Sequence, residues 1–271
     1  MLKEALSMPL KASKTGKDMK PAMENISLDQ FKAMCEELRA VGKIPFELGY
    51  DLARSPYIEY HYGFIYEDDE FSRTVWRYFD KHYTKGIAFL LLQIARESEP
   101  EIRAEILMML GRTLDQMLTN PNIECEQDMA SAVVNLAARH ARCGADIERE
   151  KATIVLGWIG RLPQAALLGS LMLEDNHEKV RAWAASSFMQ MASRLPDADK
   201  EALKTMSLPY FAQALEQEKD IFAVGVMVGS LGDLCGKKFS LSWAAIEAKD
   251  RERIEKYRKS ALRFIAKLAS A

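Results

Sequence analysis

The sequence predicts an all-α protein, an α-solenoid of stacked antiparallel helix pairs. Three observations predict it. Apolar residues recur at spacings of three and four through most of the 271 residues, which is the period of an amphipathic helix. Gly and Pro, which both weaken helix interiors, are scarce, with 14 and 9 copies. Helix–turn–helix units recur at intervals of roughly 40 residues, as in a repeat array.

The composition is that of an ordinary folded protein. Apolar residues make up 48% and charged residues 28%, and the formal net charge is −2. So small a net charge argues against a strong general attraction to nucleic acid. No apolar stretch approaches the roughly 18 residues of a membrane-spanning helix, and the first residues lack the apolar core of a secretory signal. We therefore expect a cytoplasmic protein with no membrane contact.

The sequence lacks the usual catalytic and metal-binding motifs. None of its cysteines forms a C-x-x-C pair, so we expect reduced, structural thiols at Cys35, Cys125, Cys143 and Cys235. His140 lies three residues before Cys143, but a structural zinc site needs about four ligands. The chain holds no P-loop, dinucleotide fingerprint or nucleophile elbow. We therefore expect no metal, no cofactor and no catalytic residue, hence a protein that is not an enzyme.

The chain divides into a short tail and one helical domain. Residues 1–24 show no clear period and are expected to form a mobile or loosely docked tail. Residues 25–271 are expected to form a single domain. Within it we expect an aromatic N-terminal cap at 25–84, repeats at 85–235 and a C-terminal capping helix at 236–271.

The first helix is predicted to begin after Ser27. Ser27 and Gln30 fit a capping box, in which each side chain bonds to the other residue's backbone N–H. Phe31 and Cys35 lie on the apolar face that follows, and Gly42 is expected to end the helix.

Four helix pairs make up the predicted repeats. In the first pair, Ile87–Ile94 is followed by a polar turn and by a second helix from Glu101 to Gly111. The same order recurs at Leu167–Met172, where the second helix begins at Lys179. Two weaker copies have second helices at Arg149–Gly157 and Asp220–Gly232. Aligning the second helices places four residues at equivalent positions: Arg103, Arg149, Arg181 and Val224.

The stretch from Leu167 to Met191 resembles a HEAT repeat, a member of the armadillo-like class. Asp175, Val180 and Arg181 match the family's Asp–x4–Val–Arg signature. The resemblance covers about residues 85–235 and implies a ladder of acidic and basic side chains between neighbouring repeats. The expected ladder residues are Asp175, Arg181, Glu97, Arg103 and Arg149. The resemblance also implies an interrupted ladder. Cys143 takes the acidic position of one copy, and the copy with Val224 has neither the acidic nor the basic residue.

The C-terminal segment is predicted to be one long helix, about Ser242 to Leu268, that covers the open end of the array. Residues 237–271 hold ten Lys or Arg and four Asp or Glu, a net of +6. We expect a solvated face in which Glu252–Lys256 and Glu255–Lys259 form i,i+4 pairs. The alternative is a basic helix that binds phosphate or an acidic protein face.

Aromatic residues are concentrated in residues 57–83, which hold ten of the chain's 24 Phe, Trp and Tyr. Tyrosine and tryptophan offer rigid contact area with a polar group, which suits a binding site. The candidates for partner binding here are Tyr60, Tyr62, Tyr66 and Trp76. The alternative is an N-terminal cap packed by aromatic rings, with the acidic run Glu67–Glu70 as a helix start.

Trp158 and Trp183 are further candidates, because each has an arginine nearby in the sequence. Some HEAT-like DNA glycosylases hold nucleic acid in a groove lined by Trp and Arg, and Arg161 and Arg181 lie near these two tryptophans in sequence. The balanced charge of this chain disfavours that function.

The resemblance implies a scaffold or adaptor and no chemistry. We therefore expect a non-enzymatic protein that binds a protein or peptide on the concave face of the solenoid. The alternatives are a nucleic-acid-binding protein of the DNA glycosylase type and a bacterial immunity or regulatory protein that binds a toxin.

Overall fold

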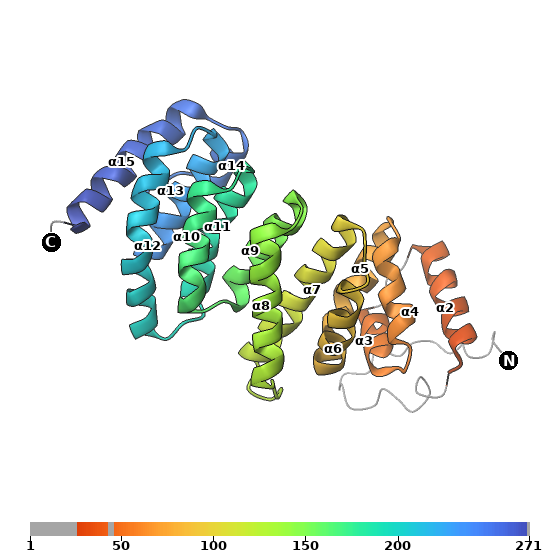
Figure 1. The fold of residues 1–271 in the computed structure, drawn as a ribbon. Coiled ribbons are helices and arrows are strands. Elements are labelled where there is room, and N and C mark those ends of the chain that lie inside the picture. The colour runs from red at the N-terminus through yellow and green to blue at the C-terminus, as the bar shows by residue number, and fades with distance from the viewer. Residues whose placement is uncertain (1–25, 43–45, 270–271) are drawn as a thin grey trace, which may run out of the picture.

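The computed structural model describes residues 26–42 and 46–269 (Figure 1). The predicted tail, residues 1–24, lies outside the described residues. The described residues form an all-helical protein without strands, as the sequence predicts. None of the helices in this part of the chain combines the length and apolar character needed to cross a membrane.

The N-terminal third consists of short helices. They are α2 (Leu28–Val41), α3 (Phe46–Arg54), α4 (Ile58–Gly63), α5 (Glu70–Arg77) and α6 (Tyr83–Ile94), with the 3-10 turns η1 (Phe64–Tyr66) and η2 (Tyr78–His82). The predicted capping box at the start of α2 is present, since Gln30 N donates to Ser27 Oγ and Ser27 N donates to Gln30 Oε1. Gly42 ends α2 with a left-handed backbone, φ 66°, as expected for a glycine C-cap.

Longer helices follow in pairs. They are α7 (Pro100–Thr119), α8 (Gln127–Cys143), α9 (Asp146–Ile159), η3 (Leu162–Gln164), α10 (Ala165–Glu174), α11 (Glu178–Ala192), α12 (Asp197–Gln217) and α13 (Ile221–Cys235). We call α6, α8, α10 and α12 the first helices and α7, α9, α11 and α13 the second helices. Each first helix packs against the second helix that follows it, and the second helices pack side by side in chain order. The helices accordingly follow one another along the molecule, with α2 and α15 at opposite ends (Figure 1).

Small residues let the second helices approach closely. A Cβ added at Gly157 of α9 would lie 2.9 Å from the Ser187 Cα of α11. Beside it, the Ser187 hydroxyl donates to the Thr153 carbonyl at 2.8 Å. Gly111 of α7 is in a similar position, because its Cβ would meet the Val155 side chain at 2.7 Å. The second helices therefore form the tightly packed layer of the molecule, and the first helices contact one another less.

The predicted C-terminal helix is wrong in one respect, because it is two helices and not one. They are α14 (Trp243–Glu247) and α15 (Arg251–Ala269). Lys249 has φ 51°, which no helix interior tolerates, and Asp250 caps α15 by accepting from Arg253 N at 3.1 Å. The break lets Ile246 pack on Gly225 of α13, while α15 packs across both α12 and α13.

The expected i,i+4 ion pairs of α15 do not form among the described residues. Glu255 pairs with Arg258 at 3.1 Å instead of with Lys259, and no ion pair joins Glu252 to Lys256. Arg258 also donates to the Leu215 carbonyl at the end of α12, so this guanidinium fixes the position of α15.

Replacing Gly157 with Ala is expected to lower the free energy of unfolding by about 1–3 kcal/mol, because the new Cβ meets the backbone of Ser187. The matched control is Gly229→Ala in α13, where the nearest atom is 4.0 Å away. That change should leave stability unchanged or raise it by up to about 1 kcal/mol through helix propensity. Urea unfolding of both variants measures this, and equal effects would contradict the close α9–α11 contact.

Candidate partner-binding surface

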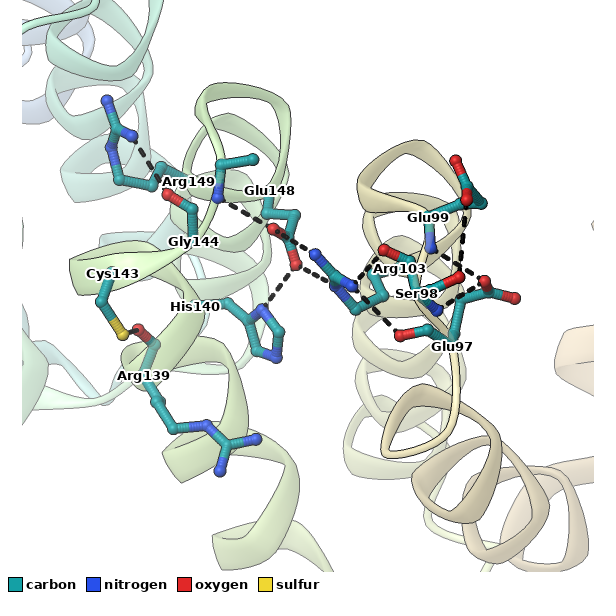
Figure 2. A network of polar contacts seen from close by, with 11 residues as sticks. Glu97, Ser98, Glu99, Arg103, Arg139, His140, Cys143, Gly144, Glu148 and Arg149 are labelled. Atoms are coloured by element: carbon teal, nitrogen blue, oxygen red, sulfur yellow. Dashed lines mark hydrogen bonds and ion pairs between the residues drawn. The ribbon is translucent and has the colours of Figure 1, made fainter.

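A ladder of arginine–carboxylate pairs runs along the turns that join first and second helices. Arg103, near the start of α7, donates from Nε and Nη2 to the two oxygens of Glu148, at 2.7 and 3.1 Å. Its Nη1 donates to the backbone carbonyls of Glu97 and Ser98 in its own turn, at 3.1 and 2.7 Å. Figure 2 shows the guanidinium bridging the two turns.

Two further pairs repeat this geometry. Arg149 donates to both oxygens of Asp175, at 2.8 and 2.9 Å, and to the carbonyl of Gly144. Arg181 donates to both oxygens of Glu218, at 2.6 and 3.0 Å, and to the Asp175 carbonyl at 2.7 Å. Each arginine therefore joins a carbonyl of its own turn to a carboxylate of the next turn.

The ladder carboxylates are buried, and each also caps backbone N–H groups of its own turn. Glu148 accepts from Ala145 N, Asp175 from His177 N, and Glu218 from Lys219 N and Asp220 N. Burial alone would raise the pKa of Asp175, but the Arg149 guanidinium and the His177 N–H hold it below its usual range. The pKa of Glu148 and that of Glu218 are lowered in the same way, by Arg103 and Arg181. The ladder is therefore ionised at neutral pH.

Two expectations about the ladder need correction. Cys143 does not interrupt it, because Glu148 supplies the carboxylate of that rung from the first turn of α9. The copy with Val224 does carry an acid, since Glu218 stands six residues before Val224, as Asp175 stands six before Arg181. The equal offset is the signal that identifies Glu218. The ladder ends there because Val224 replaces the arginine.

The aromatic cap is mostly a packed core. Tyr62 and Trp76 are only 8% and 6% exposed, and their rings pack around Phe79, which is fully buried. These two predicted partner-binding residues therefore expose little side-chain surface to a partner. Tyr60 is half-buried against Phe64.

Tyr66 differs from its neighbours because it is 56% exposed. Its hydroxyl donates to Glu97 Oε2 at 2.8 Å and lies 3.1 Å from the Tyr62 hydroxyl. Of the four aromatic candidates in residues 57–83, Tyr66 is thus the most exposed.

Two histidines are buried in the same cap. His61 Nε2 lies 2.9 Å from the Val75 carbonyl and must donate to it, so His61 Nδ1 accepts from His82 Nε2 at 3.0 Å. Burial lowers the pKa of His61 to about 3. Burial and the neighbouring Lys85 lower the pKa of His82 to about 4. Both rings are therefore neutral in the folded protein.

A second aromatic group lies where α11, α13 and α14 meet. Trp183, Phe222 and Trp243 have ring centroids 6.1–6.3 Å apart, and we call them the aromatic trio. Trp243 is 48% exposed, and it was not among the binding residues predicted from the sequence. Trp183 Nε1 is buried and finds no acceptor within the described part of the chain. Trp158 is half-buried on α9, so the two predicted tryptophans lie on second helices but are not in one ring cluster.

Exposed charges on the second helices have both signs. Glu101, Glu105 and Arg112 are exposed on α7, Lys179 on α11 and Asp233 on α13. Outside the ladder, Arg194 pairs with Asp115, with N–O distances of 2.5 and 2.9 Å, so these two charges neutralise each other. The exposed charges of the second helices are therefore mixed in sign, whereas a phosphate backbone favours a continuous basic surface.

Comparisons with known proteins add no relative. The chain matches no family model, no curated protein and no solved structure. Among the described residues, no group of three or more His, Cys, Asp and Glu side chains is arranged to hold a metal ion.

Replacing Arg149 with Met is expected to lower the free energy of unfolding by about 2–4 kcal/mol, because it leaves the buried Asp175 carboxylate without its cation. Combining it with Asp175→Asn should recover part of the loss. Lys200→Met, which removes a surface pair, is the control and should not change stability measurably. Chemical denaturation of all variants gives the coupling energy, and additive losses would contradict a direct pair.

Acid is expected to unfold the protein through His61 and His82. Their pKa values are depressed in the folded state, so the unfolded chain binds more protons once the pH falls below about 6.5. Stability is fully present above that pH. Between about pH 6.5 and 5 it should fall by up to about 1.4 kcal/mol per pH unit for each histidine. Unfolding curves across this range should show a clearly shallower slope for the double variant His61→Gln, His82→Gln, and an unchanged slope would refute the assignment.

Proposed function

We propose that the chain is a HEAT-like α-solenoid that works as a non-enzymatic scaffold and binds a protein or peptide on the exposed side of its second helices. The aromatic trio is the observation that carries this proposal. It places a large, partly exposed aromatic surface at the junction of α11, α13 and α14. Surfaces of this kind supply most of the binding energy in protein interfaces.

One polar atom of the trio favours a peptide ligand. Trp183 Nε1 is a buried donor that has no acceptor among the described residues. A buried polar group without a partner costs about 1–3 kcal/mol. An extended peptide backbone offers a carbonyl to this indole N–H, so a bound peptide would remove that cost.

The charge pattern distinguishes this function from the nucleic-acid alternative. Acidic and basic residues are mixed on the second helices, whereas a phosphate backbone attracts a continuous basic surface. The expected cytoplasmic location and the toxin-binding alternative remain proposals without a geometric argument of their own.

The test is selection of peptides from a random displayed library with the purified chain, followed by affinity measurement on the selected peptides. Trp243→Ala is expected to weaken binding at least tenfold, because truncating a central aromatic contact costs about 2 kcal/mol or more. Leu118→Ala, which removes an exposed apolar side chain at the far end of α7, is the control and should leave affinity unchanged. Peptides that bind both variants equally would place the site elsewhere, and binding of duplex DNA at physiological salt would favour the alternative function.

A further inference from the structure

Glu97 stands in the register of the ladder, but among the described residues no arginine donates a hydrogen bond to its carboxylate. It precedes Arg103 by six residues, as Asp175 precedes Arg181. Its Oε1 accepts from Ser98 N and Glu99 N, at 2.8 and 2.9 Å. Glu218 holds its own turn in the same way, since its Oε1 accepts from the N–H groups of the next two residues, both at 2.8 Å.

The two carboxylates differ in the donor on their second oxygen. Oε2 of Glu218 accepts from Arg181 Nε at 2.6 Å, whereas Oε2 of Glu97 accepts from the Tyr66 hydroxyl at 2.8 Å. The difference follows from the fold. In every other rung, the arginine comes from the second helix of the preceding pair. Glu97 follows α6, and the short helices of the aromatic cap stand before α6 in place of such a second helix.

We propose that an arginine side chain of a bound protein or peptide docks on Glu97, takes the position of the Tyr66 hydroxyl and adds a fourth rung to the ladder. This inference names one contact of the partner, and it rests on the proposed binding function.

The internal rungs show why this contact selects arginine. In each of them, Nε and Nη2 of one guanidinium bind the two oxygens of one carboxylate. This planar fork is available to arginine and not to lysine. Asp175 shows that a neighbouring cation does not prevent the contact. Asp175 binds Arg149 although Arg181 donates to the Asp175 backbone carbonyl at 2.7 Å. Arg103 likewise donates to the backbone carbonyl of Glu97.

The surroundings of Glu97 suit an incoming cation. The N–H of Glu99 and the Tyr66 hydroxyl lower the pKa of Glu97, so the carboxylate is charged at neutral pH. Ser98 and Glu99 beside it are exposed, as is the Tyr66 ring. Once its hydroxyl is displaced, that ring can stack on the planar guanidinium. Figure 2 shows Glu97 at the outer end of the network, with Arg103 and Glu148 on its inner side.

The test is an NMR titration of the full chain with N-acetyl-arginine methylamide, with the lysine analogue as the comparison probe. The arginine probe should shift the backbone amide signals of Ser98 and Glu99, and the lysine probe should shift them several-fold less. Glu97→Gln should abolish the arginine-specific shift. Tyr66→Phe should strengthen arginine binding about fivefold, because the probe no longer displaces a hydrogen bond of about 1 kcal/mol.

Glu105→Gln, an exposed change on α7 outside the ladder, is the matched control and should leave the titration as in the original chain. Circular dichroism melting confirms that each variant is folded. Equal shifts with both probes, or an arginine response that survives Glu97→Gln, would overturn the inference. The proposed function is tested separately. Trp243→Ala should weaken peptide binding at the aromatic trio at least tenfold and leave the arginine titration at Glu97 unchanged, and unchanged peptide binding in that variant would contradict the proposed function alone.

Discussion

The structure depends on one interaction. It is the bidentate pairing of an arginine with a carboxylate in the next inter-helix turn along the array. Arg103, Arg149 and Arg181 each satisfy one carboxylate and at least one backbone carbonyl, and the carboxylates in turn satisfy backbone N–H groups. Buried ion pairs add little net stability when they replace apolar contacts, because both ions lose hydration. These pairs instead fix the register, which is the alignment of each helix pair with its neighbour. A helix pair displaced by one residue would leave a charge buried without its partner.

The ladder also explains why the two ends of the molecule are built differently. At the N-terminal end, a carboxylate in ladder register remains, and the aromatic cap supplies the Tyr66 hydroxyl to it. At the C-terminal end, Val224 removes the arginine, and the last second helix is covered by apolar contacts. Ile246 of α14 packs on Gly225, and Ile254 of α15 is fully buried. A repeat unit cannot bury its own apolar face, so the terminal ones need such atypical neighbours.

The sequence predicts features that depend on local chemistry better than features that depend on distant packing. The capping box at Ser27 and the C-cap at Gly42 need only neighbouring residues, and both are present as predicted. The apolar pattern does not predict the break near Lys249, because the break depends on how α14 and α15 pack against different neighbouring helices. The composition of residues 57–83 does not show which aromatic residues are exposed. Tyr62 and Tyr66 are four residues apart, yet one is buried and the other is exposed.

The second-helix layer is held at both ends, which bears on its capacity to bind a partner. The ladder fixes the ends of α7, α9 and α11 at the turns. Near the opposite end, Asp115 of α7 binds Arg194, which follows α11. The 14 residues of α9 lie between these two contacts, beside the 20-residue α7. A surface fixed in this way loses little conformational entropy when a ligand binds, so more of the contact energy appears as affinity. Trp158 of α9 and Trp183 of α11 lie on this layer, so the partner binding proposed above would use side chains whose helices are already held in place.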